Sequence, residues 1–273
     1  LPREWPVDLH AAELDSISGR IAQLLHPNAK IHIMGYQDVL YPDGFFDASF
    51  SNVPFGNYGV ADPKYNTYKW YIHDYFFGKT LDKVRPGGLI VFITSKYLMD
   101  SKSSNVRRYI SQRAELMVAV RLPAGTFKGI ANTEVTTDVL FLKKRDKELI
   151  IDEHWLHLGL TDNGVPVNEY YLDNPDCLLG TMEFSKNMYG SEKDTACINS
   201  DPNVDILQEL EAALSSLSER WVGEYIPPQQ QNENSITEEK DAPPPELPAD
   251  PDVKNFTYSL VDDTLYYREN DTM

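Results

Sequence analysis

Residues 89–94 form an almost entirely apolar run, LIVFIT, which follows the turn-forming sequence Arg85-Pro86-Gly87-Gly88. A short apolar run bounded by a turn predicts a strand that is buried on both faces of a parallel sheet. Parallel strands need long crossover connections, and the sequence offers helical periodicity on both sides of the run. Tyr68–Val84 and Asn105–Arg113 are the predicted helices. This order predicts an α/β fold with a mostly parallel sheet.

Further elements extend the same alternation in both directions. Strands are expected at Val7–Leu14, Lys30–Met34, Phe45–Phe50, Leu116–Leu122 and Asp138–Leu142. A helix is expected after the first of these strands, with Ser16 as its N-cap and Pro27 at its end.

The charge of the chain limits its partners. It has 42 acidic against 25 basic residues, a formal net charge of −17. This excess argues against a non-specific nucleic-acid coat protein, because such binding depends on neutralised phosphates. A local basic strip remains a candidate, with a solvated helix face as the alternative. Its residues are Lys102, Arg107, Arg108 and Arg113.

Metal and membrane sites are not expected. Cys177 and Cys197 lack the spacing of a zinc site or a disulfide framework, and the pair His154 and His157 lacks a third ligand. No apolar run approaches the roughly 20 residues of a membrane helix, and Leu1 opens no secretory signal pattern. We therefore expect a cytoplasmic protein.

The tetrapeptide Asn52-Val53-Pro54-Phe55 directly follows the predicted strand Phe45–Phe50. In open α/β sheets, ligands bind at the carboxyl ends of the strands. The alternative is a turn in which the asparagine and the proline supply only backbone geometry.

The tetrapeptide and its surroundings resemble the amino-methyltransferases that carry an (N/D/S)-P-P-(Y/F) motif, especially the adenine-N6 DNA methyltransferases. Four segments match in order over roughly residues 8–145: Ala12-Glu13-Leu14-Asp15, Gly35-Tyr36-Gln37-Asp38-Val39, Asn52-Val53-Pro54-Phe55, and Arg85-Pro86-Gly87-Gly88 with the strand that follows. More specifically, Glu13–Ile21, Asn52–Tyr58 and His73–Ser95 look like the methylase part of helicase-methylase fusions of bacterial mobile elements. The resemblance implies a Rossmann-like class I methyltransferase sheet.

The resemblance also implies S-adenosyl-L-methionine as the cofactor. Glu13, with Leu14 after it, would hold the ribose hydroxyls. Asp38 would take the adenine amine of the cofactor, and Val39 would pack on its ring. The alternatives are a solvated strand-terminal acid at Glu13 and a turn cap at Asp38.

The implied reaction explains the residue types in the tetrapeptide. The lone pair of adenine N6 is delocalised into the ring, so two oxygen acceptors must hold the amine hydrogens. The side-chain oxygen of Asn52 can be one acceptor, and the carbonyl of Val53, held extended before Pro54, the other. Phe55 would stack on a base that has left the duplex. Val53 stands where proline is usual, but its carbonyl is the same.

The resemblance predicts an incomplete sheet. These enzymes carry a central first strand and a glycine-rich loop upstream of the acidic strand, and no residue before Val7 supplies them. We therefore expect a fragment of a larger protein.

Four parts are expected along the chain. Residues 1–147 form the partial methyltransferase core, and residues 148–224 form an irregular C-terminal extension with a helix at 205–221. Residues 225–255, rich in proline and acids, are predicted to be a disordered linker. Residues 256–273 are the start of a further domain, opening with a hairpin.

The expected function is transfer of a methyl group to adenine N6 in DNA. The expected partners are DNA and the flanking domains of the parent protein, a helicase among them. Two alternatives stay open: a methyltransferase that acts on another amide or amine, such as protein glutamine, and a non-catalytic nucleic-acid-binding module.

Overall fold

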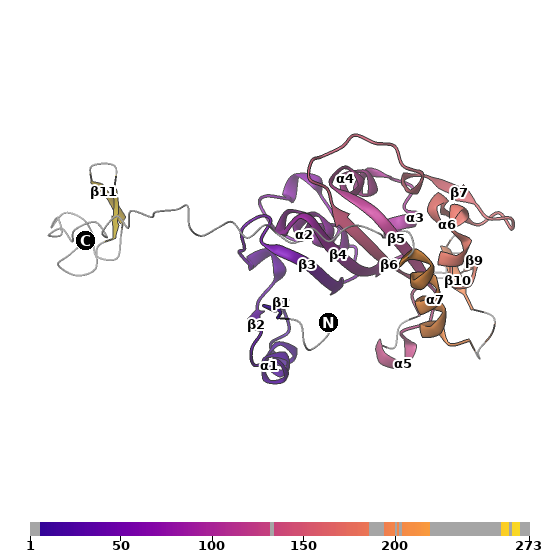
Figure 1. Ribbon diagram of the computed structural model, residues 1–273, viewed down its shortest axis with the longest axis horizontal. Coiled ribbons are helices and arrows are strands. Elements are labelled where there is room, and N and C mark those ends of the chain that lie inside the picture. The colour runs from indigo at the N-terminus through magenta and orange to yellow at the C-terminus, as the bar shows by residue number, and fades with distance from the viewer. Residues whose placement is uncertain are drawn as a thin grey trace. The chain divides into compact units, whose positions relative to one another are not determined.

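The computed structural model describes residues 6–131, 134–185, 194–199, 201, 204–218, 258–261 and 264–267. The chain divides into two compact units, Leu1–Val222 and Gly223–Met273. The first unit contains the sheets and helices that position the candidate site (Figure 1).

The central sheet of the first unit has four strands. Their order is β3 (Phe46–Asn52), β4 (Val84–Ser95), β6 (Thr137–Lys144) and β5 (Ala114–Leu122). β3 and β4 run parallel, whereas β6 is antiparallel to both β4 and β5. The predicted α/β fold is confirmed, but the sheet is mixed, not mostly parallel, because β6 lies between β4 and β5 and runs opposite to both.

β4 begins at Val84, five residues before the predicted strand. The predicted turn is instead an irregularity within the strand, where the register with β3 shifts between Phe46 and Ala48. Gly87 has φ +73°, and a Cβ atom on Gly88 would lie 2.6 Å from the carbonyl oxygen of Asp47. Glycine is therefore required where the two strands approach this closely.

Two helices pack on each other and on this sheet. α2 (Ile72–Lys83) contacts β4, where the rings of Phe77 and Phe92 lie 5.0 Å apart, and α4 (Asn105–Arg113) contacts β5. α4 has the predicted bounds. α2 begins four residues later than predicted, because a 3₁₀ turn (Asn66–Tyr68) and a left-handed residue, Lys69, precede it.

The basic strip proposed along α4 is wrong in one member. Arg107 is 1% exposed, and its guanidinium donates hydrogen bonds to the carbonyl oxygens of Leu98 and Leu156. Buried carbonyl groups need hydrogen-bond donors, and Arg107 supplies them to these two residues. Arg107 is therefore a structural residue and not a phosphate contact.

The segment after β6 packs on the same core. Trp155, Leu156, Met182 and Cys197 are buried together with residues of β5 and β6. Its elements are the 3₁₀ turn His154–Leu156, β7 (Leu158–Leu160), β8 (Pro166–Asn168), α6 (Glu169–Asp173), the 3₁₀ turn Pro175–Cys177, β9 (Thr181–Ser185), β10 (Asp194–Ile198) and α7 (Ile206–Ser218). Two short helices, α3 (Tyr97–Asp100) and α5 (Lys128–Ala131), precede β6.

A buried polar cluster ties this segment to the sheet. Arg121, fully buried, donates two hydrogen bonds to Asp138 and one to Asp100. Asp100 also accepts a hydrogen bond from the backbone N–H of Asn168 in β8, at 3.0 Å. The cluster therefore fixes β5, β6 and β8 relative to one another.

The first strands of the unit form a separate parallel pair, β1 (His10–Glu13) with β2 (Lys30–Ile33), joined by α1 (Ser16–Leu25). Asp15, and not Ser16, is the N-cap of α1, since its carboxylate accepts a hydrogen bond from the backbone N–H of Ser18. Within the described part of the chain, β1 pairs only with β2, and β3 pairs only with β4. The sheet is thus divided, as expected.

In the second unit, β11 (Tyr258–Val261) and β12 (Thr264–Tyr267) form the predicted antiparallel pair. The predicted linker, residues 225–255, lies outside the described residues. Among the helices that the structure describes, none is long and apolar enough to cross a membrane.

Candidate functional site

The tetrapeptide lies at the carboxyl end of β3. Asn52 is the last residue of the strand, pairs with Ile93 of β4, and has an exposed side chain. The backbone N–H of Val53 donates to the carbonyl oxygen of Ile93 at 3.0 Å, and the Val53 side chain is 2% exposed. Phe55 is 37% exposed. The core therefore anchors Val53 and leaves the polar and aromatic groups on either side of it open.

The residues predicted to bind the cofactor lie around the carboxyl end of β1 and β2. Glu13 ends β1 and pairs with Ile33 of β2. The 3₁₀ turn Tyr36–Asp38 begins three residues after Ile33. One oxygen of Glu13 accepts the backbone N–H of Asp15, and one oxygen of Asp38 accepts the side-chain amide of Gln37. Their other oxygens make no hydrogen bond within the described residues, so each carboxylate keeps an oxygen for a ligand.

The apolar neighbours of these acids differ in exposure. Leu14 is 76% exposed, whereas Val39 is 5% exposed and therefore already covered by protein. The roles of Glu13, Leu14, Asp38, Val39 and the tetrapeptide stay predictions.

Helix α2 connects the two groups of predicted site residues. Lys79 donates hydrogen bonds to the carbonyl oxygen of Gln37 at 3.0 Å and to Asp62 at 3.2 Å. Gln37 precedes Asp38, and Asp62 lies in the loop after the tetrapeptide. A single buried ammonium therefore holds both segments. Sequence reasoning missed this lysine, although its spacing of four residues from Tyr75 places it on the buried face of the helix.

Hydrogen bonds stabilise the charged forms of Lys79 and Asp62 inside the protein. Burial raises the pKa of the Asp62 carboxyl, but hydrogen bonds from Tyr75 and Lys79 outweigh burial and hold that pKa below its usual value. Burial is also the largest effect on Lys79 and lowers its pKa, against the opposing effect of Asp62. Asp62 in turn accepts the backbone N–H groups of Lys64 and, through its carbonyl, of Tyr65. It thereby shapes the loop.

Two further titratable groups lie in the first turn of α2. Burial raises the pKa of Asp74 to about 7 and lowers the pKa of His73. His73 Nε2 lies 3.4 Å from the Asp74 carboxylate, and His73 Nδ1 is buried without a hydrogen-bond partner among the described residues. Asp74 is therefore protonated below about pH 7, and burial favours the neutral form of His73.

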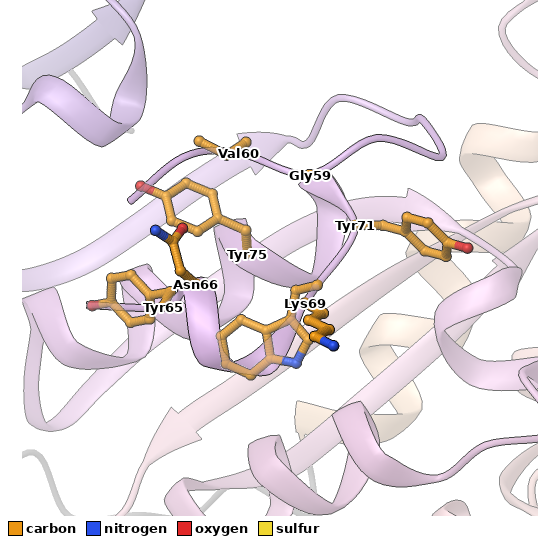
Figure 2. A pocket seen from close by; sticks show the side chains of 8 residues that line it. Gly59, Val60, Tyr65, Asn66, Lys69, Tyr71 and Tyr75 are labelled. Carbon is orange, nitrogen blue, oxygen red and sulfur yellow. The ribbon is translucent and has the colours of Figure 1, made fainter. Parts of the chain in front are cut away.

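The loop after the tetrapeptide forms a pocket against α2 with a cavity volume of ≈ 240 Å³. Its lining residues are Gly59, Val60, Tyr65, Asn66, Lys69, Trp70, Tyr71 and Tyr75. Figure 2 shows Tyr65, Asn66 and Tyr75 gathered on one side, with Gly59 and Val60 over them and the ring of Tyr71 set apart. Sequence reasoning did not find this pocket, because most of its lining comes from a loop without periodicity.

Comparison with known proteins gives a partial relative. The chain is 35% identical over 147 residues, 51% of its length, to the defense against restriction protein B of Escherichia phage P1. It spans only 6% of that protein's length. No protein-family model matches the chain.

Two solved structures illustrate the fold likeness. One is a Listeria monocytogenes protein described as a class I S-adenosylmethionine-dependent methyltransferase, with a TM-score of 0.45 and 18% identity over 55% of this chain and 49% of that chain. The other is the M protein of the type I restriction enzyme EcoKI, with a TM-score of 0.41 and 15% identity over 77% of this chain and 58% of that chain.

The described residues hold no cluster of three or more histidine, cysteine, aspartate or glutamate side chains that could bind a metal ion. His154 and His157 contact different carboxylates, those of Asp173 and Asp152.

Proposed function

We propose that the chain is part of an S-adenosylmethionine-dependent methyltransferase that methylates adenine N6 in DNA. The observation that carries the proposal is the position of Asn52-Val53-Pro54-Phe55 at the carboxyl end of β3, with Asn52 exposed and Val53 anchored. The sequence supports this assignment through the ordered resemblance of four segments, and the fold is compatible with it.

The residues present fit the cofactor. A carboxylate oxygen accepts hydrogen bonds from hydroxyl groups and amines. Glu13 and Asp38 each keep one oxygen available, and both lie near the carboxyl end of the β1–β2 pair. When bound, the cofactor supplies the methyl group. Glu13 would hold its ribose hydroxyls, and Asp38 its adenine amine.

The chain's own contribution to the reaction is to orient the amine. The side-chain oxygen of Asn52 and the carbonyl oxygen of Val53 accept the two N6 hydrogens, which makes the nitrogen lone pair available for attack. The hydrogen bond from Val53 N–H to the carbonyl oxygen of Ile93 fixes the Asn52–Val53 peptide, and Pro54 favours an extended backbone at Val53. Phe55 stacks on the base and holds it in place. Positioning of this kind supplies much of the acceleration in a group transfer.

The proposal includes a larger protein. The partial relative is a phage protein of which the chain matches a small part, which supports a methylase segment within a multidomain protein of a mobile element. We place a helicase among its flanking domains, following the resemblance of Asn52–Tyr58 and His73–Ser95 to helicase-methylase fusions.

The test is transfer of a tritiated methyl group from the cofactor to DNA by the complete parent protein, at a measurable wild-type rate. Asn52→Ala is expected to lower the rate by about 10²- to 10³-fold, the usual effect of removing one oriented group, while cofactor binding is retained. Asn57→Ala is the matched control, because it removes an exposed asparagine five residues away in the same loop. If the tritium label appears in protein glutamine and not in DNA, the substrate is a protein and the DNA assignment is wrong. Equal rates for wild type and Asn52→Ala would refute the catalytic assignment.

A further inference from the structure

The pocket behind the tetrapeptide is built from aromatic rings that are held in place. Tyr65 and Tyr75 are 5% and 2% exposed, and their rings lie edge to face at 5.5 Å. Trp70 lies against α2 at Gly78, where a Cβ atom would come within 2.1 Å of the indole. Only glycine at that position lets the indole occupy this site. The lining is therefore rigid before any ligand arrives.

The Trp70 indole lines the cavity and is packed among other aromatic rings. The Tyr68 ring stacks on the indole at 4.2 Å, and Tyr109 meets it edge-on at 4.7 Å. Tyr65, which lines the pocket, is nearly parallel to the indole, but its ring centre is 6.2 Å away. A planar ligand in the cavity would therefore meet aromatic faces and edges on several sides.

Polar groups stand among these rings. Asn66 brings an amide, and Lys69 brings an ammonium group from a left-handed backbone with φ 53° and ψ 38°. Lys69 makes no ion pair within the described residues, whereas the neighbouring Lys64 is held by Asp43 and Asp82. A non-glycine residue in this conformation carries strain, which is common at ligand-binding loops.

We propose that this pocket receives a second, unstacked nucleobase of the DNA substrate, next to the base that is methylated. The proposal rests on the proposed function and names the form of its substrate: DNA that is locally single-stranded. The loop that lines the pocket continues directly from Phe55, and Tyr58 O accepts the backbone N–H of Ile72 at the start of α2. The loop thus links the tetrapeptide to the pocket.

The size and chemistry of the cavity favour a base. A cavity of ≈ 240 Å³ is smaller than the roughly 300–1,000 Å³ of sites for drug-sized ligands, so it fits one ring system and not a whole cofactor. Aromatic rings stack on any base, and the Lys69 ammonium suits the adjoining phosphate. The side-chain oxygen of Asn66 accepts the backbone N–H of Asp62, which leaves its NH₂ group to donate to a base edge. Stacking also suits an acidic protein, which gains little from phosphate contacts.

The test measures DNA binding without methyl transfer. The protein carries Asn52→Ala and Phe55→Ala, and no cofactor is added. Stacking on Phe55 is thereby removed, so failure of the catalytic assignment leaves the result unaffected. At low ionic strength it is titrated with a 12-nucleotide single-stranded oligodeoxyadenylate, an abasic strand of equal length and charge, and a duplex. Fluorescence anisotropy of the labelled strands gives Kd.

The single strand is expected to bind about fivefold to 150-fold more tightly than the abasic strand, the range of one stacked base. Trp70→Leu removes this preference, Trp70→Phe keeps most of it, and Phe184→Ala, which removes a 60% exposed ring outside the pocket, leaves it unchanged. Val60→Phe fills the cavity from the loop side, without altering the core, and removes the preference as well.

Equal binding of the single strand and the abasic strand would overturn the proposal, as would absence of binding to both or tighter binding of the duplex. So would an unchanged preference in both Trp70→Leu and Val60→Phe, with circular dichroism confirming that each variant is folded.

Discussion

Replacing Asp74 by asparagine is expected to stabilise the protein above neutral pH. Asp74 is 8% exposed in the first turn of α2, and the buried His73 lies 3.4 Å from its carboxylate. Burial raises its pKa to about 7, although a hydrogen bond from the Tyr71 backbone opposes the shift. The folded protein therefore holds a proton that the unfolded chain, with a pKa near 3.8, has already released at pH 6.

The sign and size of the effect follow from this difference. Between pH 4 and pH 7 the folded state binds more protons than the unfolded state, so the free energy of unfolding falls as the pH rises and levels off above pH 7. A shift of about three pKa units corresponds to roughly 4 kcal/mol at about 1.4 kcal/mol per unit. Of this, about 2–3 kcal/mol accumulates between pH 5 and pH 8. Asparagine has the shape of the neutral acid and does not titrate.

The assay is urea unfolding, followed by circular dichroism, of wild type and Asp74→Asn at pH 5 and pH 8. The stability difference in favour of the variant should grow by about 2–3 kcal/mol between the two pH values. The lowered pKa of His73 acts on both proteins and cancels in the difference. Asp47→Asn, at a side chain 81% exposed, is the matched control substitution. A difference that does not change with pH would refute the reasoning.

Three further substitutions test the packing. Arg121→Met should cost about 3–5 kcal/mol in urea unfolding, because Asp138 stays buried without its cation; a cost below about 1 kcal/mol would contradict the buried cluster. Lys69→Gly should stabilise the protein by about 1 kcal/mol, since glycine adopts φ 53° without strain; destabilisation would show that the lysine side chain holds the loop. Leu24→Gln should change stability by less than about 0.5 kcal/mol, because Leu24 is 82% exposed; a larger loss would mean that α1 is covered.

The sequence predicts an element correctly where its apolar spacing and its turn residues match the way the element is buried in the fold. α4 keeps its predicted bounds, and β3 ends at Asn52, which puts the tetrapeptide at a strand terminus. The spacing of apolar residues predicts burial wrongly where no other described segment covers the helix face. The apolar residues Ile17 and Ile21 of α1 are 62% and 52% exposed, although their spacing is that of a packing face.

Long-range contacts explain what the sequence does not show about the candidate site. Lys79 is a charged residue in a helix, and nothing near it in the sequence indicates that it reaches Gln37, 42 residues earlier. Trp70 is a large aromatic residue of the kind usually found in a core. Its place beside the cavity depends on Gly78 of α2, which leaves room for the indole against the helix. Such contacts depend on how the loop folds back, which periodicity does not encode.

β1 and β3 each carry backbone N–H and C=O groups on the side where the described residues place no partner strand. Phe50, 57% exposed on β3, adds apolar surface beside one of these edges. An edge of this kind is a template for strand addition by another chain. Concentrated preparations of the chain should therefore associate edge to edge, and an extended peptide that pairs with β3 should act as a cap that keeps them monomeric.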